Sequence, residues 1–124
     1  GVTMSNTTVT GNNTAAGANA EIILLNAGTY ADADAAVDAM EAGGSYTLNH
    51  QANIEANDAF LFAYESDDST AKVRIAIAYF AAADDETGGA DNIATGALDG
   101  VDLLELDDIS EVTDLVDTNF SIVA

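Results

Sequence analysis

Two apolar runs in the middle of the chain constrain the fold most, because both alternate with a period of two residues. They are the two halves of Asp58–Phe80, DAFLFAYESDDSTAKVRIAIAYF, and the six-residue polar stretch Ser66–Ala71 separates them. Successive side chains of a β-strand point to opposite faces, so this alternation is the pattern of two strands. Val, Ile, Phe and Tyr also pack well on a pleated surface. Six residues exceed a tight two-residue turn, which predicts a hairpin closed by a looser loop.

Aromatic residues concentrate in the same stretch, which makes the predicted hairpin the seed of the core. Five of the eight aromatic residues of the chain lie in it: Phe60, Phe62, Tyr64, Tyr79 and Phe80. A chain of 124 residues indicates one domain, which buries roughly two thirds of its unfolded surface. Much of the 48% hydrophobic content is alanine, so the expected core is modest.

The charge balance excludes several classes of partner. The net charge is −20, from 22 acidic residues against Lys72 and Arg74. Such a field repels phosphates and anionic lipids, so we expect no nucleic acid partner and no membrane insertion. It also predicts a stability that rises with salt or calcium, because screening relieves self-repulsion. A solvated acidic surface, as in marine or halophilic proteins, is the alternative explanation of the same charge.

The residue types that catalytic and metal sites need are scarce. The chain has no cysteine, which excludes disulfides and thiolate chemistry, and its one histidine is His50. A zinc site on His50 would need several carboxylates, and the GxSxG pattern of a serine nucleophile is absent. With 22 acids, close carboxylate pairs arise by chance, and nothing marks a catalytic pair. We therefore expect no enzymatic activity.

The segments around the hairpin predict further strands and a first helix. Glu21–Leu25 is a short apolar run that Asn26–Gly28 ends. Thr29 is the predicted N-cap of the helix, with Asp32 three residues later as in a capping box. Apolar residues then recur at helical spacing until the glycine pair Gly43–Gly44.

The last quarter of the chain predicts a strand, a second helix and a closing strand. Val101–Leu106 is the strand, Asp108–Val116 is an amphipathic helix capped by Asp108, and Phe120–Val123 is the final apolar run. The expected fold is thus mainly β (α+β): a small antiparallel β-sandwich or sheet with two short helices.

The first twenty residues form a separate segment, ahead of a β-rich domain over residues 21–124. Gly1–Ala20 is rich in Thr, Asn, Gly and Ala, and its larger apolar residues are Val2, Met4 and Val9. One interpretation is a flexible chain end. The other is an edge strand that pairs with a neighbouring subunit through those three residues.

Acidic residues cluster among glycines between the hairpin and the next strand. The candidate ligands are Asp84, Asp85, Glu86, Asp91 and Asp99. Carboxylates in a glycine-containing loop suit calcium, which takes six to eight oxygen ligands. EF-hand spacing and GGxGxD repeats are absent, so a solvated acidic loop is the alternative.

The C-terminus combines the predicted short helix, the acidic residue Asp117 and the terminal hydrophobic residues Phe120, Ile122 and Val123. This combination resembles the uncleaved secretion signal of type I secretion substrates, which include repeats-in-toxin proteins, surface-layer proteins and adhesins. The likeness covers roughly Ala59–Ala124, with residues 108–124 as the signal. It implies a partner in the type I secretion machinery and an extracellular or cell-surface location. The missing nonapeptide repeats leave a repeats-in-toxin β-roll unsupported.

Two functions remain open at this point. The first is a secreted, non-enzymatic structural protein that forms homopolymers as a filament or surface layer. The second is a calcium-stabilised C-terminal binding or export module of an adhesin or secreted enzyme.

Overall fold

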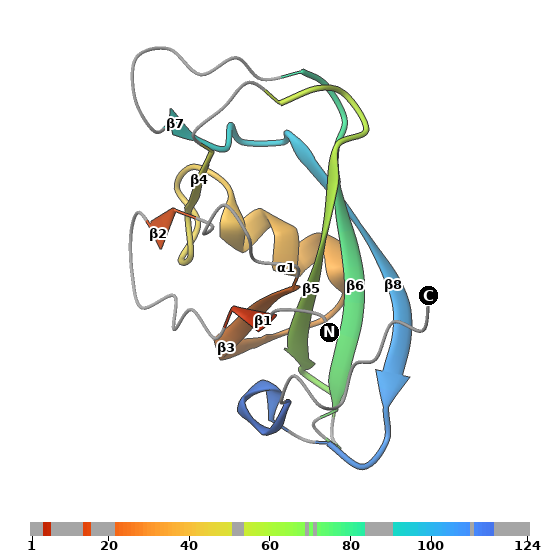
Figure 1. The fold of residues 1–124 in the computed structure, drawn as a ribbon. Coiled ribbons are helices and arrows are strands. Elements are labelled where there is room, and N and C mark those ends of the chain that lie inside the picture. The colour runs from red at the N-terminus through yellow and green to blue at the C-terminus, as the bar shows by residue number, and fades with distance from the viewer. Residues whose placement is uncertain are drawn as a thin grey trace.

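Strands make up most of the regular structure. The computed structural model describes residues 4–5, 14–15, 22–50, 54–68, 70, 72–83, 91–109 and 111–115. In chain order the elements are β1 (Met4–Ser5), β2 (Thr14–Ala15), β3 (Ile22–Tyr30), α1 (Ala33–Met40), β4 (Leu48–His50), β5 (Ala59–Ser66), β6 (Val73–Phe80), β7 (Asp91–Asn92), β8 (Leu98–Leu106) and the 3₁₀ helix η1 (Val112–Asp114) (Figure 1).

The predicted hairpin is confirmed and lies at the centre of the larger sheet. Strands β5 and β6 pair antiparallel from Ala59↔Tyr79 to Glu65↔Val73. Strand β8 adds antiparallel to the other side of β6, while β3 runs parallel to β5 and β1 runs parallel to β3. The order in the sheet is β1-β3-β5-β6-β8. A second, smaller sheet has the order β2-β4-β7.

The prediction of a mainly β fold is confirmed, but the antiparallel sandwich with two helices is wrong. The five-stranded sheet is open and mixed, and α1 packs on one of its faces. The physical reason is the connection between β3 and β5, which contains α1 and β4. Parallel neighbours need such a crossover, whereas a tight turn would have made the pair antiparallel.

The first helix begins three residues later than predicted. Its N-cap is Asp32, whose Oδ1 accepts a 2.9 Å hydrogen bond from the Ala35 N–H. Thr29 instead lies in β3, paired with Glu65. Strand β3 continues through the predicted break by a register shift between Leu25 and Thr29, where Gly28 adopts a φ of +101°. A left-handed φ is open to glycine, so this glycine bends the strand without ending it.

The second helix is also shorter than predicted, and Asp108 does not cap it. The described residues after β8 contain one 3₁₀ turn, η1, with extended backbone at Glu111 (φ −126°, ψ 135°). The Ile109 carbonyl accepts a 3.0 Å hydrogen bond from the Val73 N–H. This bond to the start of β6 holds Ile109 against the sheet, which is incompatible with an α-helix starting at Asp108.

The sheet has an apolar layer on each face. On the α1 side the buried residues include Ile23, Leu25, Phe62, Tyr64, Ala76 and Ala78 of the strands, with Val37 and Met40 of α1. On the other side they are Ile22, Leu24, Ala63, Val73 and Ile75, with Val112 and Leu115. Figure 1 shows η1 at the end of the sheet where β5 finishes. Alternation along each strand therefore supplies both layers.

Candidate functional site

The edge strand β8 is the most unusual surface of the described structure, and α1 covers only its beginning. The Leu98 N–H donates to Glu41 Oε1 at 2.8 Å, and the Gly96 N–H donates to Glu41 Oε2 at 2.5 Å. The Gly100 N–H donates to Asp34 Oδ1 at 3.0 Å. Two helix carboxylates thus satisfy backbone groups that an edge strand would otherwise leave unpaired.

Gly100 is where the helix and the strand come closest. A Cβ at this position would lie 2.5 Å from the carbonyl oxygen of Ala33. Real Cβ atoms do not approach a backbone oxygen so closely, so the contact requires glycine. The covered part of the edge therefore ends at Gly100.

Beyond Gly100 lies the part of β8 that we call open, because it has only one neighbouring strand among the described residues and exposes large apolar side chains. In the part of the chain that the structure describes, β6 is the only strand next to β8. Val101, Leu103 and Leu104 are 45%, 53% and 48% exposed, and they are the exposed large hydrophobic residues of the described chain. The register shifts here, because Asp102 pairs with Ala76 and Leu104 pairs with Ile75. Leu103 consequently has no partner in β6, and its side chain is the most exposed of the three.

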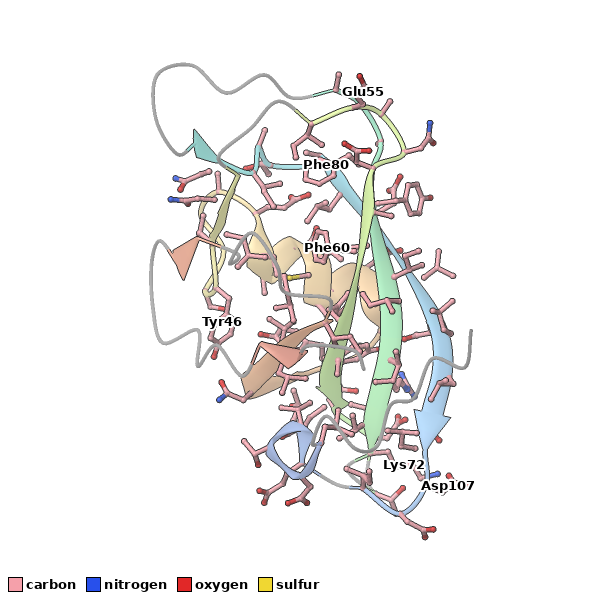
Figure 2. The ribbon with its side chains drawn as sticks, viewed as in Figure 1. Tyr46, Glu55, Phe60, Lys72, Phe80 and Asp107 are labelled. Carbon is pink, nitrogen blue, oxygen red and sulfur yellow. The ribbon has the colours of Figure 1, made fainter. Side chains whose placement is uncertain are left out.

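Both basic residues lie beside this edge in one cluster of ion pairs. Lys72 Nζ lies 2.9 Å from Glu105 Oε1 and 2.8 Å from Asp107 Oδ1. Figure 2 shows Lys72 and Asp107 next to each other at the end of the sheet. This cluster fastens the last part of β8 to the start of β6.

Arg74 makes the more enclosed half of the cluster, with a side chain 18% exposed. Its Nε lies 3.0 Å from Glu105 Oε2, and its Nη2 lies 2.6 Å from Asp68 Oδ2. Its Nη1 donates a 3.0 Å hydrogen bond to the Ala31 carbonyl. Arg74 therefore connects β8 to the loop after β5 and to the segment before α1.

The pKa values of these groups follow from their contacts. Hydrogen bonds to Asp107 and Glu105 raise the pKa of Lys72, and Lys72 lowers the pKa values of both carboxyls. Burial raises the pKa of Tyr64, and its hydrogen bond to Asp102 adds to that rise.

The predicted calcium ligands are only partly described. Asp84, Asp85 and Glu86 lie outside the described residues. Asp91 pairs with His50 in the smaller sheet, whereas Asp99 pairs with Tyr79 in the larger one. The charge of Asp99 raises the pKa of Tyr79. Within the described ranges, no group of three or more His, Cys, Asp or Glu side chains could hold a metal.

The other predicted site residues lie mostly outside the described chain. Among the predicted assembly residues, Met4 belongs to β1 and pairs with Ile22, while Val2 and Val9 are outside. The predicted secretion-signal residues Asp117, Phe120, Ile122 and Val123 are outside as well.

Sequence reasoning missed that the β8 edge is half covered and half open. The available signal was the pair Leu103–Leu104, because two adjacent leucines cannot both follow an alternating pattern. Nothing in the sequence pointed to Glu41 and Asp34 as acceptors for the β8 backbone, since they lie more than fifty residues away.

Comparison with protein families, with curated proteins and with solved structures finds no significant match. Separately, the described residues contain no helix long and apolar enough to cross a membrane.

Proposed function

We propose that this chain is a secreted, non-enzymatic structural protein that assembles into a filament or surface layer through the edges of its larger sheet. The observation that supports it best is the part of β8 after Gly100, where no second described strand lies beside β8 and Val101, Leu103 and Leu104 are exposed. Such an edge is a template for pairing with another chain.

The opposite edge also favours strand addition. There the two-residue strand β1 pairs with Ile22 and Ile23, although β3 runs on to Tyr30. The two edges of the sheet differ in sequence and in cover. A contact between unlike edges is heterologous, and repeated heterologous contacts that do not close produce a filament.

Export rests on the C-terminal pattern. Asp117 and the terminal hydrophobic residues Phe120, Ile122 and Val123 resemble part of a type I signal and support secretion through a type I transporter, whereas the helix expected before them is a short 3₁₀ turn. Deleting Asp117–Ala124 should abolish export from a cell carrying such a transporter, while deleting Gly1–Gly11 should leave it intact. Equal secretion of both truncated chains would contradict this part of the proposal.

Light scattering of the purified chain tests assembly directly. The full sequence should form large particles, and a chain without Gly1–Gly11 should remain a monomer with the same circular dichroism spectrum. A full-length chain that stays monomeric across protein concentration and salt would refute the structural role.

Calcium is the second element of the proposal, supported by the sequence cluster Asp84, Asp85 and Glu86, whereas Asp91 and Asp99 lie in different sheets. Binding to the folded state alone would raise its stability. The melting temperature should rise more with calcium than with magnesium at the same ionic strength. An equal rise in melting temperature with both ions would mean that calcium acts only by screening charge. A calorimetric titration of the chain with calcium that releases or absorbs no heat would lead to the same conclusion.

A further inference from the structure

We infer that the open part of β8, Val101–Leu106, is the acceptor for the N-terminal segment Gly1–Gly11 of a second copy of this chain. This inference rests on the proposed assembly and assigns its two surfaces. Below, these residues of β8 are called the acceptor edge.

The acceptor edge begins where the cover from α1 ends. Asp34 accepts from the Gly100 N–H, and the next residue is the exposed Val101. An incoming strand needs free backbone groups for its hydrogen bonds and apolar side chains for its affinity. Over the same few residues of β8, the described chain places a neighbouring strand on one side only and leaves Val101, Leu103 and Leu104 exposed.

Charge selects the segment that can approach this edge. Acidic residues lie along and beside it: Asp99, Asp102, Glu105, Asp107 and Asp108. Like charges on neighbouring strands are destabilising, so most of this chain is a poor partner for its own copy. All 22 acidic and both basic residues follow Ala20, so the first twenty residues carry no charged side chain. An uncharged segment avoids that repulsion.

The apolar spacing of the two surfaces also agrees. Val101 pairs with Ile77 and Leu104 pairs with Ile75, so the register shift places them at successive positions on one face. Val2 and Met4 are two residues apart, which puts them on one face of an extended strand. One segment can therefore set both of its apolar side chains beside Val101 and Leu104.

The exchange gives up one described strand pairing within each copy. In the structure the described N-terminal contact with the larger sheet is the pairing of Met4–Ser5 with Ile22–Ile23. A strand along the acceptor edge would replace this pairing with a longer one. The swap of an identical element between copies is a known low-cost route to oligomers.

Two lysine substitutions on the acceptor edge test the assignment. Lysine on an edge strand blocks pairing with another strand. The Val101→Lys/Leu104→Lys chain should scatter as a monomer, and its melting temperature should change little because both side chains are about half exposed. The control Ala56→Lys/Ala82→Lys makes the same charge change at two exposed positions away from β8 and should polymerise like the unmodified chain.

Mixing provides a second readout. The chain without Gly1–Gly11 keeps the acceptor edge alone, and the Val101→Lys/Leu104→Lys chain keeps the donor segment alone. Their mixture should form one-to-one dimers and nothing larger. Polymers in that mixture would overturn the assignment of the two surfaces.

A cross-link covers the case in which the lysine variant fails to fold. The chain has no cysteine, so Met4→Cys and Leu104→Cys chains each carry one thiol. After mixing and oxidation, mass spectrometry should find dimers containing one of each. Dimers of random composition, or a disulfide within a Met4→Cys/Leu104→Cys double variant, would overturn the inference.

These experiments distinguish a failure of the proposed structural function from a failure of the acceptor-edge assignment. A monomeric unmodified chain refutes the proposed function and this inference with it. Polymers that persist unchanged in the Val101→Lys/Leu104→Lys variant, while its control also polymerises, refute the acceptor edge and leave the structural function standing.

Discussion

The hydroxyl of Tyr64 donates a 2.6 Å hydrogen bond to Oδ1 of Asp102, which connects β5 to β8 across the intervening strand β6. The Tyr64 side chain is fully buried and stacks against Phe62, with 5.8 Å between ring centroids. Asp102 lies between Val101 and Leu103 on the edge strand. The interior of the sheet therefore fixes the position of β8 at the point where its apolar side chains are exposed.

Replacing Tyr64 with phenylalanine should remove this connection and keep the aromatic packing. We expect a loss of about 1.5–3 kcal/mol in the free energy of unfolding, the usual range for a hydrogen bond to a charged group. Urea unfolding followed by circular dichroism measures it. Tyr46→Phe, which removes a hydroxyl from a half-buried ring of the same core, should change stability less. Equal losses in the two variants would refute the role of Asp102.

The Lys72 ion pairs should give a stability contribution that depends on pH at both ends of the scale. Lys72 lowers the pKa values of Glu105 and Asp107 in the folded state. Their contribution to stability is therefore complete above about pH 4, the pKa of carboxyls in the unfolded chain, and it is lost at lower pH. The pKa of Lys72 is raised, so its contribution is complete below about 10.4 and is lost at higher pH.

The measurement is the difference in melting temperature between the unmodified chain and Lys72→Met. This difference should be constant between those limits and shrink outside them. Lys72→Arg should reproduce the unmodified profile at acid and neutral pH and should lack the alkaline loss, because a guanidinium stays protonated where a lysine titrates. A difference that does not vary with pH would show that the side chain stabilises by packing alone.

Glu41 should contribute more to the free energy of unfolding than an acidic residue on the surface, because it is 2% exposed and accepts hydrogen bonds from two backbone N–H groups. Glu41→Ala leaves the Gly96 and Leu98 donors unsatisfied and should cost about 2–4 kcal/mol. Glu41→Gln keeps one acceptor but sets its N–H₂ group against the second backbone N–H, so it should recover only part of that loss. Asp38→Ala, at an exposed position of α1, is the control and should be nearly neutral. A Glu41→Ala chain as stable as this control would contradict the proposed link between α1 and β8.

Salt should stabilise the protein despite its ion pairs. With 22 acidic residues against two basic ones, screening removes more repulsion than attraction. The screening length falls from about 30 Å at 0.01 M to about 3 Å at 1 M. The melting temperature should therefore rise steadily with sodium chloride, and Lys72→Met should rise more steeply because it has lost attractive pairs. A falling melting temperature would mean that the cluster around Lys72 and Arg74 outweighs the net charge.

Local patterns predicted the strands well, because alternation is a property of neighbouring residues. The runs around Phe62 and Ile75 became β5 and β6, and Val101–Leu106 became most of β8. The parallel pairing of β3 with β5 was not predictable in this way. It depends on the path of the chain through α1 and β4, which no short-range pattern contains.

The errors share a physical cause, namely that a distant contact overrode a local preference. Asp108 followed by apolar residues is a reasonable helix start, but the Ile109 carbonyl pairs with Val73 instead. Thr29 is a good N-cap residue, yet pairing with Glu65 keeps it in a strand. The start of the acceptor edge was not predictable for the same reason, because it is set by Asp34 and Glu41, which accept from the N–H groups of Gly100 and Leu98 just before it.

The position of the two basic residues also determines how readily proteases can cleave the folded chain. Enzymes that cut after lysine or arginine have two target bonds in this sequence, after Lys72 and after Arg74, at the start of a strand with neighbours on both sides. To be cut, that segment must leave the sheet and its ion pairs. The folded chain should therefore resist trypsin. Once unfolded, it yields only Gly1–Lys72, Val73–Arg74 and Ile75–Ala124, fragments too long or too short for routine peptide mass spectrometry.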